Sequence, residues 1–295
     1  MKNRLLLTLR HAFVLGALLF GATSSAGVTQ MANLLRSLNH AVTDPVTVTI
    51  SGNTATANIS LPGNIAADFT VNFNSTQNLS ADNLGISAQL VDINASGLIA
   101  RLPDSVLTSV PSAFPMLISV EPSGGFAFTN SYTVNIHTSN LVYAPNTPLR
   151  IFKAPLGGNF TDITEDVNQG SVNTRGREGG FSQFLIVADL RPNASVAVGK
   201  FNALSARIAS STMSPALQAQ LNATLAQART AFNANDYAGA IASVDTFRSQ
   251  VQAQAGTGLA NVWRSTRDLD NAEGSLDGMA ATLRFTLARL RDFGQ

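Results

Sequence analysis

VTVTISGNTATANISL, residues 46–61, alternates apolar and polar side chains on both sides of a turn sequence. Val46, Val48 and Ile50 are separated by threonines, SGN at 51–53 is a turn signal, and TATANISL continues as a second strand. In a strand, successive side chains point to opposite faces, so alternation indicates a strand with one buried face. The stretch predicts a β-hairpin, and the fold can be traced outward from it.

Toward the C-terminus, short segments of the same kind recur as far as Pro192. They are DFTVNF, LGISAQLVDI, MLISVE, FAFT, YTVNIHT, LRIFKA and FSQFLIVADL. Ten of the 11 prolines lie between Pro45 and Pro192, and proline breaks helix interiors. Short strands bounded by Asn, Gly, Ser and Pro are typical of antiparallel sandwiches. We expect an antiparallel β-sandwich domain over residues 44–192.

After Pro192 the pattern becomes helical. Residues 193–200, NASVAVGK, are expected to form a linker, and residues 201–295 a small antiparallel helical bundle. Ser214 followed by Pro215 is a helix start signal. A later helix is expected to carry Leu259, Val262 and Trp263, before a last one with Met279, Leu283, Leu287 and Leu290. The predicted fold class is α+β and multidomain.

Toward the N-terminus, residues 27–43 have apolar side chains at helical spacing and predict an amphipathic lead helix. Residues 1–26 combine a basic start, the apolar run AFVLGALLF and small residues, which is typical of a signal peptide cleaved after Ala26. We therefore expect a protein exported by a bacterium, periplasmic or extracellular. No later apolar run is long enough for a transmembrane segment in the mature chain.

Charge and cysteine content exclude several classes of function. Removing three basic residues with the signal peptide leaves 19 − 3 = 16 Lys and Arg against 18 Asp and Glu. Such a chain lacks the positive field that nucleic acids require, so we expect no nucleic-acid partner. It has no cysteine, which excludes zinc–thiolate sites and a cysteine nucleophile.

Three stretches, PSGGFAFTNSYTVNI at 122–136, PLRIFKAPLGGNFTDI at 148–163 and GGFSQFLIV at 179–187, carry a resemblance. The region from about 121 to 189 resembles the β-sandwich of adhesion-receptor autoproteolysis (GAIN-like) domains and their bacterial relatives. In self-cleaving members a hydroxyl attacks the preceding carbonyl with help from a neighbouring histidine. Ser182 could supply the hydroxyl, but Gly180 occupies the position of the base. The resemblance implies the final strand of a sandwich, without cleavage.

A weaker resemblance covers residues 223–256, ATLAQARTAFNANDYAGAIASVDTFRSQVQAQAG. They resemble the helical-hairpin modules at the C-termini of secreted bacterial surface proteins. A generic two-helix packing unit explains the same string equally well. The resemblance implies a role in attachment or assembly, by analogy at the level of the family.

The search for chemistry in the sequence gives few candidates. The metalloprotease, serine-hydrolase and phosphate-loop motifs are missing, so we expect no catalytic residue, no cofactor and no metal. The binding candidates are Asp162 and Asp166 in TDITED, Arg175 and Arg177 in a predicted hairpin turn, and His137 in a strand. A second acidic cluster, RDLDNAEGSLDG at 267–278, fails the EF-hand pattern and is interpreted as a solvated helix surface and turn.

These observations favour a secreted, non-catalytic binding or structural protein of the cell envelope or exterior. Its expected partner is a protein or polysaccharide of the envelope. One alternative is an exported hydrolase that uses Asp162, Glu165 and Asp166 with Arg175 or Arg177. Another is a periplasmic assembly or inhibitor protein that docks through residues 27–42.

Overall fold

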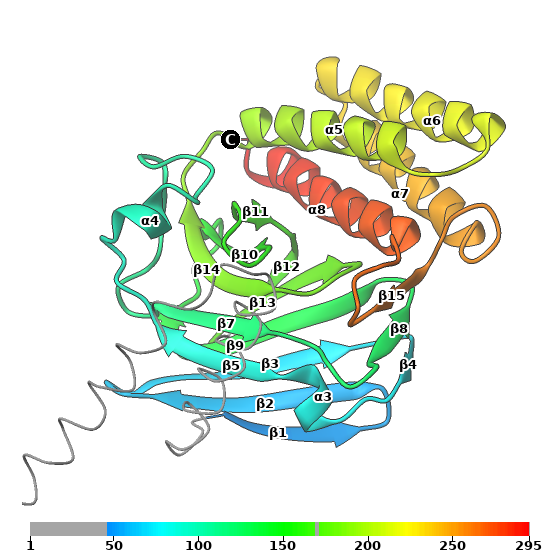
Figure 1. Ribbon diagram of the computed structural model, residues 1–295. Helices are drawn as coiled ribbons and strands as arrows, with labels where there is room; N and C mark the ends of the chain where they lie inside the picture. The colour runs from blue at the N-terminus through cyan, green and yellow to red at the C-terminus, as the bar shows by residue number, and fades with distance from the viewer. Residues whose placement is uncertain (1–45, 169–170, 295) are drawn as a thin grey trace, which may run out of the picture. The chain divides into compact units, whose positions relative to one another are not determined.

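A computed structural model describes residues 46–168 and 171–294. Antiparallel sheets come first in the chain and four long helices follow, which confirms the mixed α+β fold (Figure 1). The expected signal peptide, 1–26, and lead helix, 27–43, lie outside the described residues. Within the described residues no helix combines the length and the apolar character that crossing a bilayer requires.

The opening hairpin forms one edge of the first of two large antiparallel sheets. Val46 pairs with Ile59, and Ser51 pairs with Thr54 across the turn. In spatial order the strands are β1 Val46–Ser51, β2 Thr54–Leu61, β3 Ile65–Asn72, β9 Tyr132–Val142, β13 Ser171–Glu178 and β12 Thr164–Asn168. The inward side chains of this sheet form one wall of the main core.

The second large sheet is built around the strand that contains FLIV. In spatial order its strands are β11 Thr161–Asp162, β10 Leu149–Ala154, β14 Gln183–Asp189, β7 Met116–Val120 and β5 Ile86–Leu90, while β6 Thr108–Ser109 also pairs with β14. Phe184 and Ile186 point into the main core, where the Phe184 ring centroid lies 5.5 Å from that of Phe69. Leu185 and Val187 belong to a second core on the other face, which explains the unbroken apolar run.

That second core is covered by the connections before β7. The short helix α4 Ser96–Ile99 lies in the connection from β5 to β7, whereas the other short helix, α3 Ala81–Leu84, precedes β5 and buries Leu84 in the main core. Leu98 of α4 and Leu102 pack with Leu185 and Val187. The central strands β10, β14 and β7 are therefore buried on both faces.

A third, small sheet corrects the sequence interpretation of residues 259–269. Its strands are β15 Val262–Arg264, β8 Ala127–Thr129 and β4 Ser75–Gln77. The expected helix around Trp263 is a strand, because Trp263 pairs with Phe128 and their rings stack at 5.3 Å. The apolar side chain that suggested a bundle helix is buried instead in an aromatic cluster with Phe73, Phe126 and Phe181.

Four long helices complete the fold. They are α5 Asn193–Ser210, α6 Pro215–Asn233, α7 Tyr237–Ala253 and α8 Ala272–Phe293. The predicted linker at 193–200 is wrong: α5 starts directly after Pro192, because Ala197 extends the buried stripe of Phe201, Leu204 and Ile208 by one turn. The start signal at Ser214 is confirmed, since its side chain accepts a hydrogen bond from Leu217 N.

Helix α8 joins the helices to the sandwich. It packs against β12 and β13 on one side and against α5 and α7 on the others (Figure 1). A Cβ atom at Gly278 would lie 2.6 Å from the carbonyl oxygen of Arg177, and one at Gly179 would lie 2.5 Å from Ser275 N. Glycine is therefore required where helix and strand meet. The expected boundary between two domains is replaced by one compact unit from Val46 onward.

Candidate functional site

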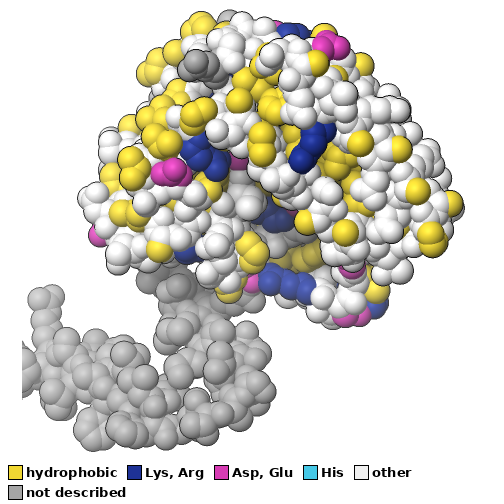
Figure 2. Space-filling view, turned by 90° about the horizontal axis from the view of Figure 1, so that it is seen from above, with side chains coloured by type: hydrophobic (Ala, Val, Ile, Leu, Met, Phe, Trp, Pro, Cys, Tyr) yellow, Lys and Arg dark blue, Asp and Glu magenta, His cyan; other side chains and the backbone are white. Residues whose placement is uncertain are grey.

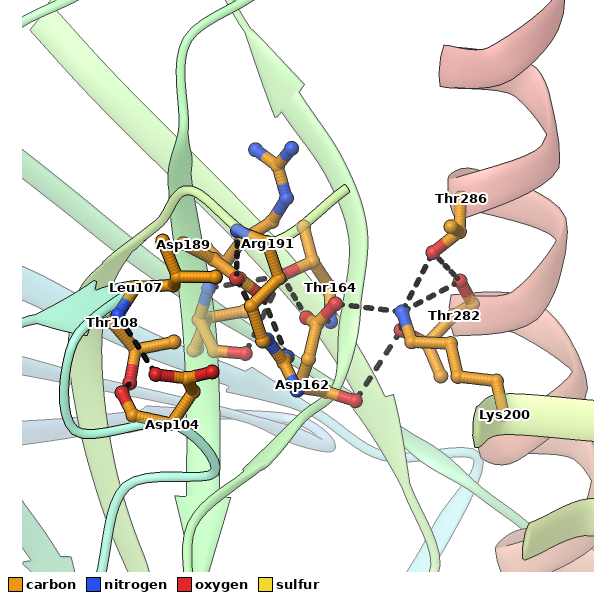
Figure 3. Close-up of polar contacts among 12 residues, drawn as sticks. Asp104, Leu107, Thr108, Asp162, Thr164, Asp189, Arg191, Lys200, Thr282 and Thr286 are labelled. Carbon is orange, nitrogen blue, oxygen red and sulfur yellow. Dashed lines mark hydrogen bonds and ion pairs between the residues drawn. The ribbon is translucent and has the colours of Figure 1, made fainter. Parts of the chain in front are cut away.

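Asp162 lies in a buried ion pair between the second sheet and the helices. Its Oδ2 accepts a hydrogen bond of 2.6 Å from Lys200 Nζ, which also donates to Thr282 and Thr286 of α8 (Figure 3). Burial raises the pKa of Asp162, but the positive charges of Lys200 and Arg150 outweigh it and hold that pKa below its usual value. Burial lowers the pKa of Lys200, and the charge of Asp162 opposes this. This pair holds α5 and α8 against β11.

Arg175 and Arg177 lie in strand β13, so the hairpin turn expected there is wrong. Their segment pairs with both β9 and β12, and these ladders keep it extended. Arg175 stays half-exposed, with its Nη2 3.6 Å from Asp166 Oδ2. The side chain of Arg177 points toward the helices, with its Nε 3.3 Å from Glu165 Oε1 and its Nη1 3.6 Å from Asp277 Oδ2. Of these two arginines, Arg177 is the one whose side chain reaches α8.

His137 lies in β9 of the first sheet, opposite Asn173 of β13, and so two positions along the ladder from Arg175. It is opposite Asp68 in the β3–β9 ladder, and its Nδ1 is 3.5 Å from Asp68 Oδ2. The His137 side chain is half-exposed. The structure therefore brings Arg175, Arg177 and Asp166 together and places His137 on the adjacent strand of the same sheet, with its side chain near Asp68, while Asp162 lies elsewhere with Lys200.

Ser182, the hydroxyl considered for self-cleavage, is buried at the start of β14. Its Oγ has no hydrogen-bond partner among the described residues. The carbonyl oxygen of Gly180 accepts a hydrogen bond of 2.9 Å from Tyr132 Oη, and the Gly180 backbone lies against Trp263. The segment that precedes Ser182 is thus packed against the aromatic side chains of Tyr132 and Trp263.

Asp277 is the centre of a polar network that the sequence analysis missed. Its carboxylate is fully buried and accepts hydrogen bonds from Arg248 Nε at 2.8 Å, Ser131 Oγ at 2.9 Å and Gln252 Nε2 at 3.1 Å. The interpretation of 267–278 as a solvated surface holds for the exposed Asp268 and Asp270 but is wrong for Asp277 and Glu273. Glycines at 274 and 278 were the available signal of a closely packed helix face.

A polar cleft opens beside this network, where the sandwich meets α7 and α8. Its volume is about 430 Å³. Amide, hydroxyl and charged side chains form most of its wall: Asn72, Asn74, Asn130, Ser131, Thr133, Arg177, Gln252 and Glu273, with Phe73. These residues come from both halves of the chain, so the cleft exists only when the sandwich and the helices are packed together. We take this cleft as the candidate functional site.

Glu273 has a carboxyl oxygen at the cleft without a hydrogen-bond partner among the described residues. It lies in the first turn of α8 and is 2% exposed, and its Oε2 has no hydrogen-bond partner among the described residues. Burial and the negative charge of Asp277 raise the pKa of Glu273 to about 7, against the opposing charge of Arg177. A buried carboxyl oxygen without a partner costs free energy. A ligand that donates a hydrogen bond would remove that cost.

The wall around Glu273 is already fixed by hydrogen bonds. Arg177 Nη1 donates to Ser131 Oγ at 3.1 Å, and Asn261 Nδ2 donates to Asn130 Oδ1 at 2.7 Å. Within residues 46–168 and 171–294, no three His, Asp or Glu side chains are grouped as a metal site would require. The cleft can therefore bind a ligand through hydrogen bonds from polar side chains that are already held in place.

One family model matches the chain, over residues 29–291, and it is described as a family of unknown function, DUF6689. The chain belongs to the DUF6689 family. A search of curated proteins returned no match. The matched range includes β3, β9, β13, α7 and α8, so the elements that form the cleft all fall within the DUF6689 unit.

Glu273→Gln is expected to remove a pH dependence of stability. Because the pKa of Glu273 is about 7 in the folded protein and about 4.5 when unperturbed, the folded state binds more protons between these values. The free energy of unfolding therefore falls as pH rises from 4.5 through 7, by on the order of 3 kcal/mol. Urea unfolding at pH 5 and pH 8 measures this, and Glu273→Gln should lose less stability than the wild type over that interval.

The exposed acid Asp82 supplies the matched control for this experiment. Asp82→Asn removes a carboxylate from a solvated helix and should keep the wild-type difference between pH 5 and pH 8. If Glu273→Gln kept the same difference as the wild type, the raised pKa of Glu273 would be disproved.

Proposed function

We propose that this protein is an exported, non-catalytic binding protein of the bacterial cell envelope or exterior, and that the polar cleft around Glu273 binds a sugar residue of an envelope polysaccharide. The observation that carries the proposal is the buried, unpartnered Oε2 of Glu273 in a cleft walled by amides and hydroxyls. Export rests on the basic, apolar and small residues at the N-terminus.

The chemistry of the cleft supports a polyhydroxylated ligand. A sugar hydroxyl can donate to Glu273 Oε2, while a neighbouring hydroxyl can accept from Arg177 or from an Asn or Gln amide. Amides suit sugars because each amide both donates and accepts hydrogen bonds. The cleft volume of about 430 Å³ lies within the range of about 300–1,000 Å³ common for small-molecule sites.

Isothermal titration of the full chain with neutral and N-acetylated hexoses and their short oligomers tests the proposal. The full chain is needed because both halves contribute to the cleft. We expect saturable binding of one of these sugars at pH 8, where Glu273 is ionised. Glu273→Gln should weaken it about tenfold to a hundredfold, since a hydrogen bond to a charged group contributes about 1.5–3 kcal/mol.

The control variant Asp82→Asn should bind the same sugar with unchanged affinity. A folded wild-type protein that binds none of the sugars would overturn the proposal, and so would binding that Glu273→Gln leaves unchanged. Free amines and amino acids belong in the same panel, because selective binding of an amine would replace a sugar as the ligand.

The hydrolase alternative has less support from the geometry. Asp162 is paired with Lys200, Asp166 with Arg175, and Glu165 with Arg177 and Arg248. Because each of these carboxylates is in an ion pair, they are better suited to joining the sheets and the helices than to acid–base chemistry on a substrate. The assembly or inhibitor alternative depends on residues 27–42, which lie outside the described residues.

A further inference from the structure

A second cavity lies on the other side of α8, under α5. Its volume is about 320 Å³. Much of its wall is apolar, formed by Pro103, Phe160, Ile163, Val196, Ala203 and Met279. It shares no lining residue with the polar cleft, and its size falls at the lower end of the range for small-molecule sites.

The charged side chains that line this cavity already have partners. Asp162 pairs with Lys200 at 2.6 Å, Arg191 with Asp189 at 2.7 Å, and Glu178 with Lys153 at 2.9 Å. The Lys200 ammonium is surrounded by Asp162, Thr282 and Thr286, as Figure 3 shows. Because these charges are neutralised within the protein, the cavity offers no single charge to an entering ionic group. Its interior suits an apolar group.

Exposed apolar side chains lie near wall residues of this cavity in the chain. Pro103 leads into a loop in which Asp104 Oδ1 accepts hydrogen bonds from the backbone N–H groups of Val106 and Leu107. The Val106 side chain is 84% exposed. Leu190, 63% exposed, precedes the wall residue Arg191 and donates its backbone N–H to Leu107 O. In Figure 3, Leu107 lies on one side of Arg191 and Lys200 on the other.

We propose that this cavity binds the aliphatic chain of a small lipid. The chain would enter past Val106 and Leu190 and lie against Phe160, Val196 and Met279. The polar head would remain at the rim, because the charged side chains in the cavity are already paired within the protein. Exposed apolar side chains beside an apolar cavity favour an amphipathic ligand over a fully soluble one. This ligand and this site are independent of the sugar and the cleft around Glu273.

Gly199→Leu is the variant that tests this site, because Gly199 lines the cavity and an added Cβ would meet no atom within 4 Å. The probe is decanoate, titrated calorimetrically into the full chain below its micelle concentration. We expect one saturable site in the wild type and at least tenfold weaker binding by Gly199→Leu. Gly97→Leu, which also meets open space but lies in α4, should bind like the wild type.

Folding of the variant is checked by thermal unfolding. Gly199→Leu should be as stable as the wild type or more stable, since leucine favours helix over glycine. If it is less stable, Val196→Ser, which removes an apolar wall contact without adding volume, should also weaken decanoate binding. The proposal would be overturned if the wild type showed no saturable binding, or if Gly199→Leu and Val196→Ser both bound decanoate as tightly as the wild type. Glu273→Gln should leave decanoate binding unchanged, which separates this test from that of the sugar site.

Discussion

Asp277→Ala is expected to lower the free energy of unfolding by about 3–5 kcal/mol. The Asp277 carboxylate is fully buried and accepts hydrogen bonds from Ser131 of the sandwich and from Arg248 and Gln252 of α7. Removing it leaves the Arg248 guanidinium, whose side chain is 16% exposed, facing a cavity, with the Glu165 carboxylate 3.8 Å away. An incompletely compensated buried charge is the reason for the large loss. Urea unfolding followed by circular dichroism at pH 7 measures it.

Two variants show which property of Asp277 matters. Asp277→Asn keeps the shape and one acceptor oxygen, so it should lose less stability than Asp277→Ala. Asp270→Ala removes a carboxylate whose side chain is 58% exposed in its ion pair with Arg207, and it should change stability by about 1 kcal/mol or less. A loss under about 1 kcal/mol for Asp277→Ala would contradict the view that this network joins the helices to the sandwich.

Asp277 also affects the candidate site, because its charge raises the pKa of Glu273. Its removal should therefore lower that pKa and reduce the fall in stability between pH 5 and pH 8. The same carboxylate thus has two measurable roles, one in packing α8 and one in setting the ionisation of the cleft.

Strand patterns allowed much of the sandwich to be predicted, because alternation depends on local geometry. Residues 46–61 form the expected hairpin, and FLIV forms a central strand buried on both faces. The resemblance to the autoproteolysis sandwich stays a prediction. Trp263 was misassigned because its spacing fits a helix as well as a strand, and only the aromatic cluster of a distant segment decides between them.

The candidate site could be predicted only in part. Arg177 is a binding candidate in the sequence, whereas Glu273 and Asp277 belong to the acidic cluster at 267–278, whose pattern indicates a solvated helix surface and turn. Gly274 and Gly278 allow α8 to approach β13 closely enough to bury these acids. That approach depends on contacts between residues about 100 positions apart in the chain, such as Asn271 Nδ2 donating to Gly179 O at 3.0 Å. A pattern of a few neighbouring residues cannot reveal contacts between residues so far apart in the sequence.

Lys200→Met is expected to destabilise the protein by about 3–5 kcal/mol at pH 7, since it leaves the Asp162 carboxylate buried without its main partner. The side chain of Asp162 is 4% exposed, so water cannot replace the ammonium. Chemical unfolding of Lys200→Met and of the wild type gives the difference. The matched variant Lys200→Met/Asp162→Asn keeps an acceptor for Thr164 and removes the charge, and it should regain a large part of the loss.

The pH dependence of this loss has a definite sign. In the wild type the pKa of Asp162 is lowered, so its contribution to stability is present above the usual pKa and is lost as pH falls through the lowered value. In Lys200→Met the ammonium is gone and burial should raise the pKa of Asp162, so acid protonates the side chain and relieves its cost. The difference between wild type and variant should therefore shrink from pH 7 to pH 4. A difference that stays constant over this interval would show that Lys200 stabilises the fold through its hydrogen bonds to Thr282 and Thr286 instead of through its ion pair with Asp162.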